Sequence, residues 1–307
     1  MFSSVKPVAV VHFSGDLYTR PRNASIPPPP APPPPVPALF IIGDSSVDCG
    51  TNDFLGTLAR ADHLPYGPLR LGLPFVPSYL GQSGSVKDMM RGLNYASAGA
   101  GIIFSSGSEL GQHISFSQQI QQVMDTFQQF ILTMGEHAAA DHISNSVFYI
   151  SIGTNDFIHY YLPDVSDVQS KFFAWRFTKF LAQTVKQEMK NLYNANVRRV
   201  VMMGLAPIGC APYYLWQYNS QNGECVQPIN NLIMEFNFVM RYTIEELNKE
   251  LVDANIIFCD AYVGSMDILK NKDQYGFSVS DTACCGLGRY NGWIMFDNVH
   301  RLGVVYG

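Results

Sequence analysis

No apolar stretch of the sequence is long enough to cross a membrane. Hydrophobic residues make up 47% of the 307 residues, but they fall into runs much shorter than the roughly 20 residues that a spanning helix needs. A clear signal peptide is also lacking, because the apolar stretch from Pro7 to Phe13 is too short and too interrupted to form its hydrophobic region. We therefore predict no transmembrane segment.

Charged residues are scarce as well. They make up 15% of the chain, against about a quarter in typical soluble domains, which indicates much buried sheet. The net charge of −5 argues against nucleic acid or an anionic membrane as the main partner. A chain of this length buries enough surface to form a large core without disulfides or metal ions.

Several motifs that would identify a particular chemistry are absent. The sequence has no C-x-x-C zinc spacing, no P-loop, no H-E-x-x-H and no G-x-S-x-G nucleophile elbow. The six cysteines do not define a pairing by themselves, although a disulfide between Cys210 and Cys225 would close the Pro-, Tyr- and Gly-rich loop that they bracket.

Proline dominates one segment and marks a domain boundary. Pro27–Pro30, Pro32–Pro35 and Pro37 follow one another almost without interruption, which is typical of a polyproline II rod without the backbone donors of a sheet. We predict that residues 1–37 form a disordered arm outside the fold. The folded domain is then residues 38–307.

From residue 38 onward, short apolar strands alternate with amphipathic helices. This alternation predicts right-handed crossovers and a mostly parallel sheet covered on both faces. The fold class is α/β, with three layers in the order α/β/α. The expected strands are residues 38–42, 93–98, 146–152, 197–203 and 255–259, and the main helices are residues 120–134, 172–192 and 232–251.

The first strand leads directly into Gly43-Asp44-Ser45. In open α/β sheets, ligands bind at the carboxyl ends of the strands, so a serine in this position is a candidate nucleophile on a rigid scaffold. The alternative is that Ser45 or Ser46 caps the helix that follows, since serine is a preferred N-cap residue.

Small polar residues also follow two later strands and occur near the end of the chain. The missing side chain of Gly99 lets a backbone N–H approach a ligand, and Asn155 adds an amide donor for the oxyanion of acyl transfer. Asp297 and His300 are three residues apart, so that the carboxylate can orient the imidazole as a base. The alternatives are a tight turn at Gly99, a helix cap at Asn155 and a solvated turn at residues 297–300.

Taken in order, these blocks resemble the GDSL-type esterases and lipases, or SGNH hydrolases, and most closely the plant branch of that family. The blocks are Gly43–Ser45, Asn94–Gly99, Gly153–Asp156 and Asp297–His300. Features of the plant branch also occur at Leu64–Gly67, Gly204–Cys210, Asn222–Cys225 and Ala283–Gly288. These features cover most of residues 38–292, and the resemblance implies a flavodoxin-like SGNH hydrolase fold.

The resemblance also implies a function and a role for each residue. Ser45 is the nucleophile, His300 the base and Asp297 the residue that orients it. The backbone N–H groups of Ser45 and Gly99, with the Asn155 amide, form the oxyanion hole. The substrate is a small-molecule or lipid carboxylic ester, hydrolysed through an acyl-serine without a cofactor, and the protein is secreted. The oligomeric state is not predicted.

Three departures from the family pattern produce a second hypothesis. A loop and helix expected after Gly67, a cysteine-containing loop expected after Met295 and the final helix expected after His300 are missing. We expect the Asp297–His300 pair to be poorly anchored, because unpacked terminal segments tend to be mobile. The alternative function is a catalytically impaired form that binds an ester ligand, or that interacts through its proline-rich arm.

Overall fold

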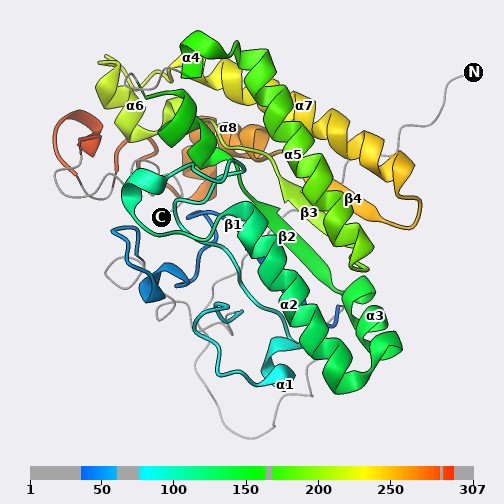
Figure 1. The fold of residues 1–307 in the computed structure, drawn as a ribbon. Coiled ribbons are helices and arrows are strands. Elements are labelled where there is room, and N and C mark those ends of the chain that lie inside the picture. Colours follow the sequence, from blue (N-terminus) through cyan, green and yellow to red (C-terminus); the bar gives the residue numbers. More distant parts are fainter. Residues whose placement is uncertain (1–35, 61–75, 164–167, 284–285, 294–307) are drawn as a thin grey trace, which may run out of the picture. The chain divides into compact units, whose positions relative to one another are not determined.

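The computed structural model describes residues 36–60, 76–163, 168–283 and 286–293 (Figure 1). Its centre is a parallel sheet in which the four strands lie side by side in chain order. The strands are β1 (Leu39–Gly43), β2 (Val147–Ser151), β3 (Arg199–Met203) and β4 (Asn255–Cys259). All four were expected from the apolar runs, and the predicted α/β class is confirmed.

The fifth expected strand, residues 93–98, forms only an edge segment. The Ile41 N–H donates to the Leu93 carbonyl at 2.9 Å and the Tyr95 N–H donates to the Ile41 carbonyl at 2.8 Å, next to β1. A regular ladder would continue from Gly43 N–H to Tyr95. That N–H instead donates to the Gln119 side chain at 2.8 Å, which interrupts the ladder, whereas the Ser97 N–H still donates to the Gly43 carbonyl at 3.1 Å. With this segment included, the strand order is 2-1-3-4-5, as in flavodoxin-like sheets.

Helices connect the strands, as the apolar spacing predicted. Figure 1 labels α1 (Val86–Met89), α2 (Phe116–Met134), α3 (Glu136–Asn145), α4 (Val168–Lys171), α5 (Ala174–Asn194), α6 (Pro212–Gln217), α7 (Gln227–Glu250) and α8 (Ala261–Lys270). Helix α2 begins four residues before the predicted start, because its first turn is polar and held by a Ser115–Gln118 capping box. None of the helices in the described part of the chain is long and apolar enough to span a membrane.

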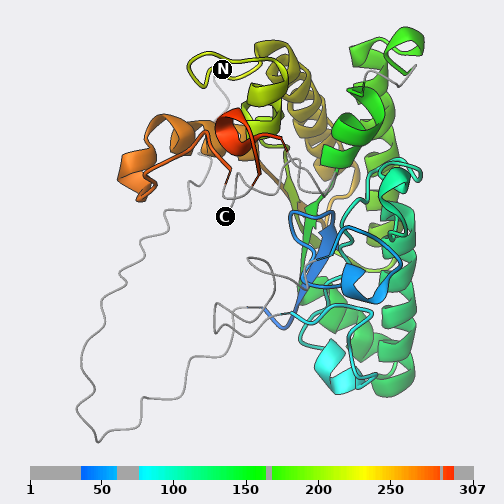
Figure 2. The same ribbon diagram turned by 90° about the vertical axis from the view of Figure 1, so that its left-hand side faces the viewer.

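The core lies between the sheet and helices α2, α5 and α7. Alternate strand residues point into it, and the ring of Phe40 stacks on Phe148 at 4.9 Å and meets the edge of Phe127 from α2 at 6.0 Å. Figure 2 shows α8 on the other side of the sheet from α2 and α5. That second face is less completely covered by the described residues, since Ile257 of β4 is 52% exposed.

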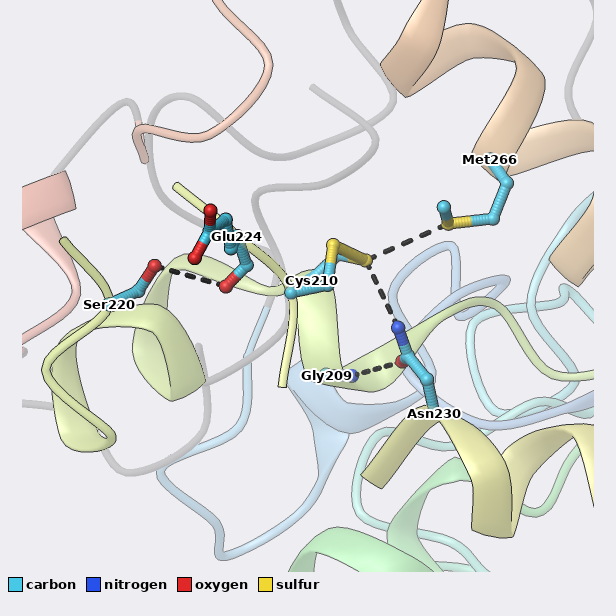
Figure 3. The surroundings of a disulfide bond; sticks show 7 residues. Gly209, Cys210, Ser220, Glu224, Asn230 and Met266 are labelled. Atoms are coloured by element: carbon cyan, nitrogen blue, oxygen red, sulfur yellow. Dashed lines mark hydrogen bonds between the residues drawn. A yellow bond between two sulfur atoms is a disulfide. The ribbon is translucent and has the colours of Figure 1, made fainter. Parts of the chain in front are cut away.

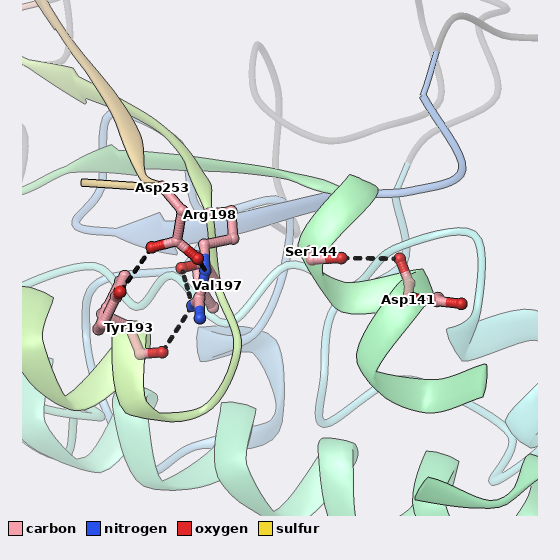
Figure 4. Close-up of polar contacts among 6 residues, drawn as sticks. All are labelled: Asp141, Ser144, Tyr193, Val197, Arg198 and Asp253. Carbon is pink, nitrogen blue, oxygen red and sulfur yellow. Dashed lines mark hydrogen bonds and ion pairs between the residues drawn. The ribbon is translucent and has the colours of Figure 1, made fainter. Parts of the chain in front are cut away.

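At the amino edge of the sheet, one arginine holds the starts of β3 and β4 together (Figure 4). Arg198 Nε donates to Asp253 Oδ2 at 2.7 Å and Nη1 donates to the Tyr193 carbonyl at 2.8 Å. The Tyr193 hydroxyl donates to the other oxygen of Asp253. Nearby, the end of α3 is closed by a Ser144 hydroxyl that donates to the Asp141 carbonyl.

A disulfide joins Cys210 and Cys225, with a Cα–Cα distance of 4.3 Å (Figure 3). It closes the loop that the sequence analysis singled out. Asn230 of α7 supports it: its Oδ1 accepts the Gly209 N–H at 2.8 Å and its Nδ2 donates to Cys210 Sγ at 3.3 Å. Among the described cysteines, Cys49 and Cys259 are free.

We expect replacement of both cysteines by alanine to lower the free energy of unfolding by about 3 kcal/mol, because the closed loop of 15 residues no longer restricts the unfolded chain. Urea titration with and without a thiol reductant measures the effect. Cys259→Ala, at an exposed free thiol, is the matched control and leaves stability unchanged. An unfolding midpoint of the native chain that the reductant does not change would contradict the prediction.

Candidate active site

Ser45 lies on a turn directly after β1 and is exposed, whereas the preceding Asp44 is buried. Asp44 Oδ1 accepts hydrogen bonds from the Ser46 N–H at 2.9 Å and the Ser46 hydroxyl at 2.7 Å. The Ser46 hydroxyl is also 2.9 Å from that of Ser151 at the end of β2. The N-cap interpretation of Ser45 and Ser46 is wrong: the next helical turn is η1 (Asn52–Phe54), and its cap position is Thr51.

Gly43 allows β1 and β2 to approach closely at this point. A Cβ atom on Gly43 would lie 2.2 Å from the Ser151 carbonyl oxygen, so any side chain would force the strands apart. Gln119 of α2 binds both polar backbone groups of Gly43, accepting its N–H at 2.8 Å and donating to its carbonyl at 2.9 Å. The sequence analysis did not identify Gln119, because glutamine at a buried helix position has no local signature.

Asp48 connects the turn of Ser45 to the turn of Gly99. Its Oδ1 accepts the N–H groups of Gly50 and Thr51 at 2.9 and 2.7 Å, and its Oδ2 accepts the Ala98 N–H at 3.0 Å. Gly99 has φ +87°, a backbone conformation that glycine adopts without strain. Gly99 therefore does lie in a tight turn, as one alternative predicted. This conformation does not test the predicted oxyanion role of its N–H.

Asn155 is brought to the same place from the end of β2. It is 3% exposed, and its Nδ2 donates to the Ala100 carbonyl at 2.7 Å. Its side chain makes no capping hydrogen bond to the helical turn that follows, η4 (Asp156–Tyr161). The helix-cap alternative is thus wrong for Asn155. The first three blocks of the sequence meet at the carboxyl edge of the sheet.

Asp156 fixes the loop after Gly99 and is fully buried. Its Oδ2 accepts the Ile102 N–H at 2.7 Å, while its Oδ1 accepts the Ile103 N–H at 2.8 Å and the Ser106 hydroxyl at 2.7 Å. Burial raises the pKa of Asp156 to about 6, and burial likewise raises the pKa of Asp44 to about 6. Asp44 and Asp156 therefore hold the turns of the site through hydrogen bonds, although neither carboxylate is exposed to solvent.

Asp297 and His300, the expected orienting residue and base, lie outside the described residues, and their roles remain predictions. Among the described histidines, His159 on η4 has a 3% exposed side chain, and its Nδ1 lies 2.5 Å from Glu109 Oε1. His137 is exposed and lies 3.3 Å from Asp141. Within the described ranges, no group of three His, Cys, Asp or Glu side chains is placed to hold a metal ion.

We expect the melting temperature to rise as the pH falls from about 7 to about 5. The folded protein takes up protons on Asp44 and Asp156 near pH 6, whereas aspartates of the unfolded chain do so only near about 3.9. The folded state therefore binds more protons in this range, and stability increases with acidity. Burial also raises the pKa of Asp48, which acts in the same direction, whereas His142, whose pKa burial lowers, acts in the opposite direction as one group against three.

A thermal melt at each pH tests this expectation. Asp156→Asn removes one of the protons taken up and flattens the dependence, whereas Asp125→Asn, at an exposed position of α2, does not. A melting temperature that falls steadily from pH 7 to pH 5 would show that the buried carboxylates do not dominate.

Comparison with known proteins identifies the family. Residues 39–302 match the family described as GDSL-like Lipase/Acylhydrolase. The chain is 33% identical over 281 residues to GDSL esterase/lipase At1g29660 of Arabidopsis thaliana, covering 84% of this chain and 76% of that protein. It is 34% identical over 308 residues to GDSL esterase/lipase At1g71691 of the same plant, covering 92% and 79%. The chain therefore belongs to the GDSL-like lipase/acylhydrolase family of ester hydrolases.

Proposed function

We propose that the protein hydrolyses carboxylic esters with Ser45 as the nucleophile, through an acyl-serine intermediate. The observation that carries the proposal is the exposed position of Ser45 on a turn that Asp44 and Asp48 hold at the carboxyl edge of the sheet. A nucleophile must be accessible and yet fixed in position, and this turn meets both requirements. Membership of an ester hydrolase family supports the same chemistry.

In the proposed reaction, Ser45 Oγ attacks the carbonyl carbon of the ester while His300 takes its proton. The oxyanion of the tetrahedral intermediate receives hydrogen bonds from the N–H groups of Ser45 and Gly99 and from the Asn155 amide. Collapse breaks the bond to the alcohol, which receives the proton from His300. Water, deprotonated by the same imidazole, then attacks the acyl carbon. The bond to Ser45 Oγ breaks and Oγ takes the proton back from His300, while Asp297 orients the imidazole throughout.

The hydrogen bonds of the site support the oxyanion role. Asn155 Nδ2 carries two hydrogens, and one of them is used to bind the Ala100 carbonyl at 2.7 Å, which leaves the second for a substrate oxygen. Gly99 lies between Ala98 and Ala100, both of which are held by hydrogen bonds. Donors fixed before the substrate arrives stabilise developing charge without reorganisation.

We propose a small-molecule or lipid ester as the substrate and no metal or organic cofactor, since each chemical step is assigned to a side chain or to the backbone. We also propose that the protein functions in an oxidising compartment. Disulfides persist mainly outside the cytosol, so the Cys210–Cys225 bond supports the secretion that the sequence resemblance implied.

A fluorophosphonate probe should form an adduct with Ser45, identified by mass spectrometry. Ser45→Ala should abolish labelling and lower kcat/KM for a short-chain ester by roughly 10⁴-fold or more, because no other group replaces the nucleophile. Ser83→Ala, at an exposed loop position, is the control and keeps both the labelling and the native kcat/KM. A native protein that melts cooperatively but takes up no probe would contradict the proposal and favour a form that binds esters without turnover.

Asn155→Ala should lower kcat by roughly 10²- to 10³-fold with little change in KM, because an oxyanion donor acts on the transition state rather than on the bound substrate. The lost bond to Ala100 also lowers stability by about 1 kcal/mol. Asn145→Ala is the matched control, since this exposed amide donates to the Asp141 carbonyl at 2.9 Å far from Ser45 in the chain. An unchanged kcat for Asn155→Ala would exclude the oxyanion role.

A further inference from the structure

The start of α5 exposes an unusual number of aromatic side chains. Residues 171–180 read KFFAWRFTKF, and the exposed fractions are 46% for Phe172, 72% for Phe173, 55% for Trp175 and 52% for Phe180. Large exposed apolar side chains that gather in one place mark an interaction surface more often than chance. We call these four residues the aromatic cluster.

The buried face of α5 consists of residues outside the aromatic cluster. One of them is Phe177, which is 3% exposed. Its ring stacks on Tyr161 at 4.7 Å and meets the edge of Phe157 at 5.7 Å. The two sets of aromatic residues therefore have different roles, and the exposed set requires a separate explanation.

The charged residues of α5 that lie between Phe173 and Phe180, Arg176 and Lys179, are both basic. From Lys171 to Lys186 the sequence contains four basic residues and no acidic one. Lys186 pairs with Glu246 and Glu250 on α7 at 3.2 and 3.5 Å, whereas Arg176 and Lys179 are exposed on the first half of the helix. There, the Arg176 guanidinium lies 5.4 Å from the ring centre of Trp175. The net charge of −5 therefore does not describe this surface.

The aromatic cluster lies on the side of the domain where substrate is expected. The chain runs from the carboxyl end of β2 through η4 to α4 and α5, and Figure 1 shows α4 next to the start of α5. Because the strands are parallel, the end of β2 and the end of β1, which carries the turn of Ser45, lie at the same edge of the sheet.

We propose that the aromatic cluster, with Arg176 and Lys179, docks this edge of the domain on the surface of an anionic phospholipid bilayer. Aromatic rings enter the boundary between headgroups and acyl chains, while arginine and lysine bind the anionic headgroups. A second copy of the chain is a poorer occupant, because self-association through this surface would bring like charges together. Docking also assigns the proposed hydrolase a lipid-borne ester as its substrate class, and this assignment rests on the proposed function.

Co-sedimentation with phospholipid vesicles tests the docking without any turnover. The full chain should bind vesicles of phosphatidylcholine mixed with phosphatidylserine more strongly than vesicles of phosphatidylcholine alone. The double variant Phe173→Ser/Trp175→Ser should lower the partition coefficient roughly tenfold or more, the value expected when two rings lose part of their apolar contact. Serine suits position 173, which is the N-cap of α5, so the fold is retained.

The charge contribution is tested by Arg176→Gln/Lys179→Gln, which should lose the preference for phosphatidylserine and the dependence on salt. Two matched controls keep native binding: Leu132→Ser/Val252→Ser, at positions that are 86% and 88% exposed, and Lys87→Gln/Lys249→Gln, at exposed lysines.

Each outcome either supports the bilayer as the partner of this surface or rules it out. A native chain that binds neither vesicle, or an aromatic variant that binds as well as the native chain, overturns the proposal. Light scattering that shows a dimer lost in Phe173→Ser/Trp175→Ser would assign the surface to a second copy instead. Hydrolysis of a soluble short-chain ester is unchanged in these variants, so a failure of docking and a failure of the proposed catalysis give different results.

Discussion

The carboxylate of Asp48 is the contact on which the geometry of the candidate site depends. One of its oxygens holds the chain after Ser45, and the other holds the Ala98 N–H at 3.0 Å, next to Gly99. The nucleophile and the proposed oxyanion donor belong to segments that are far apart in sequence, and this side chain sets the distance between them. A displacement of about 1 Å can lower a rate 10²-fold. Loss of a hydrogen bond to Asp48 should therefore lower the rate as much as loss of a contact to the substrate.

Buried carboxylates recur around the site, and they impose a cost on the fold. Asp44 and Asp156 are buried, with exposed fractions of 1% and 0%, and burial raises the pKa of both to about 6. An apolar residue in either place would avoid the loss of hydration. It would also leave the N–H groups of Ser46, Ile102 and Ile103 without acceptors. The fold therefore exchanges stability at neutral pH for turns with a fixed conformation.

Much of this architecture could be predicted from the sequence, and the parts that could not have physical reasons. Apolar runs identified the strands and placed Ser45 at a strand end, because burial in a parallel sheet leaves a direct composition signal. The contacts of Gln119, Asp48 and Asp156 could not be predicted, since a polar side chain that binds backbone groups of a distant loop has no periodicity. The start of α2 was placed too late for a related reason: its first turn is defined by capping rather than by apolar spacing.

The pairing of β1 with β2 has a consequence for how the chain folds. Gly43 pairs with Ser151 across the sheet, and its N–H is bound by Gln119 of α2. The turn that presents Ser45 therefore cannot form while only the first strand has left the ribosome. It must wait until β2, which ends at Ser151, has been synthesised, and one edge of the apolar strand Leu39–Gly43 stays unpaired in the meantime. Contacts so distant in sequence are closed slowly, and unpaired apolar strands aggregate, so expression at high rate or temperature should yield insoluble chains before it yields inactive folded ones.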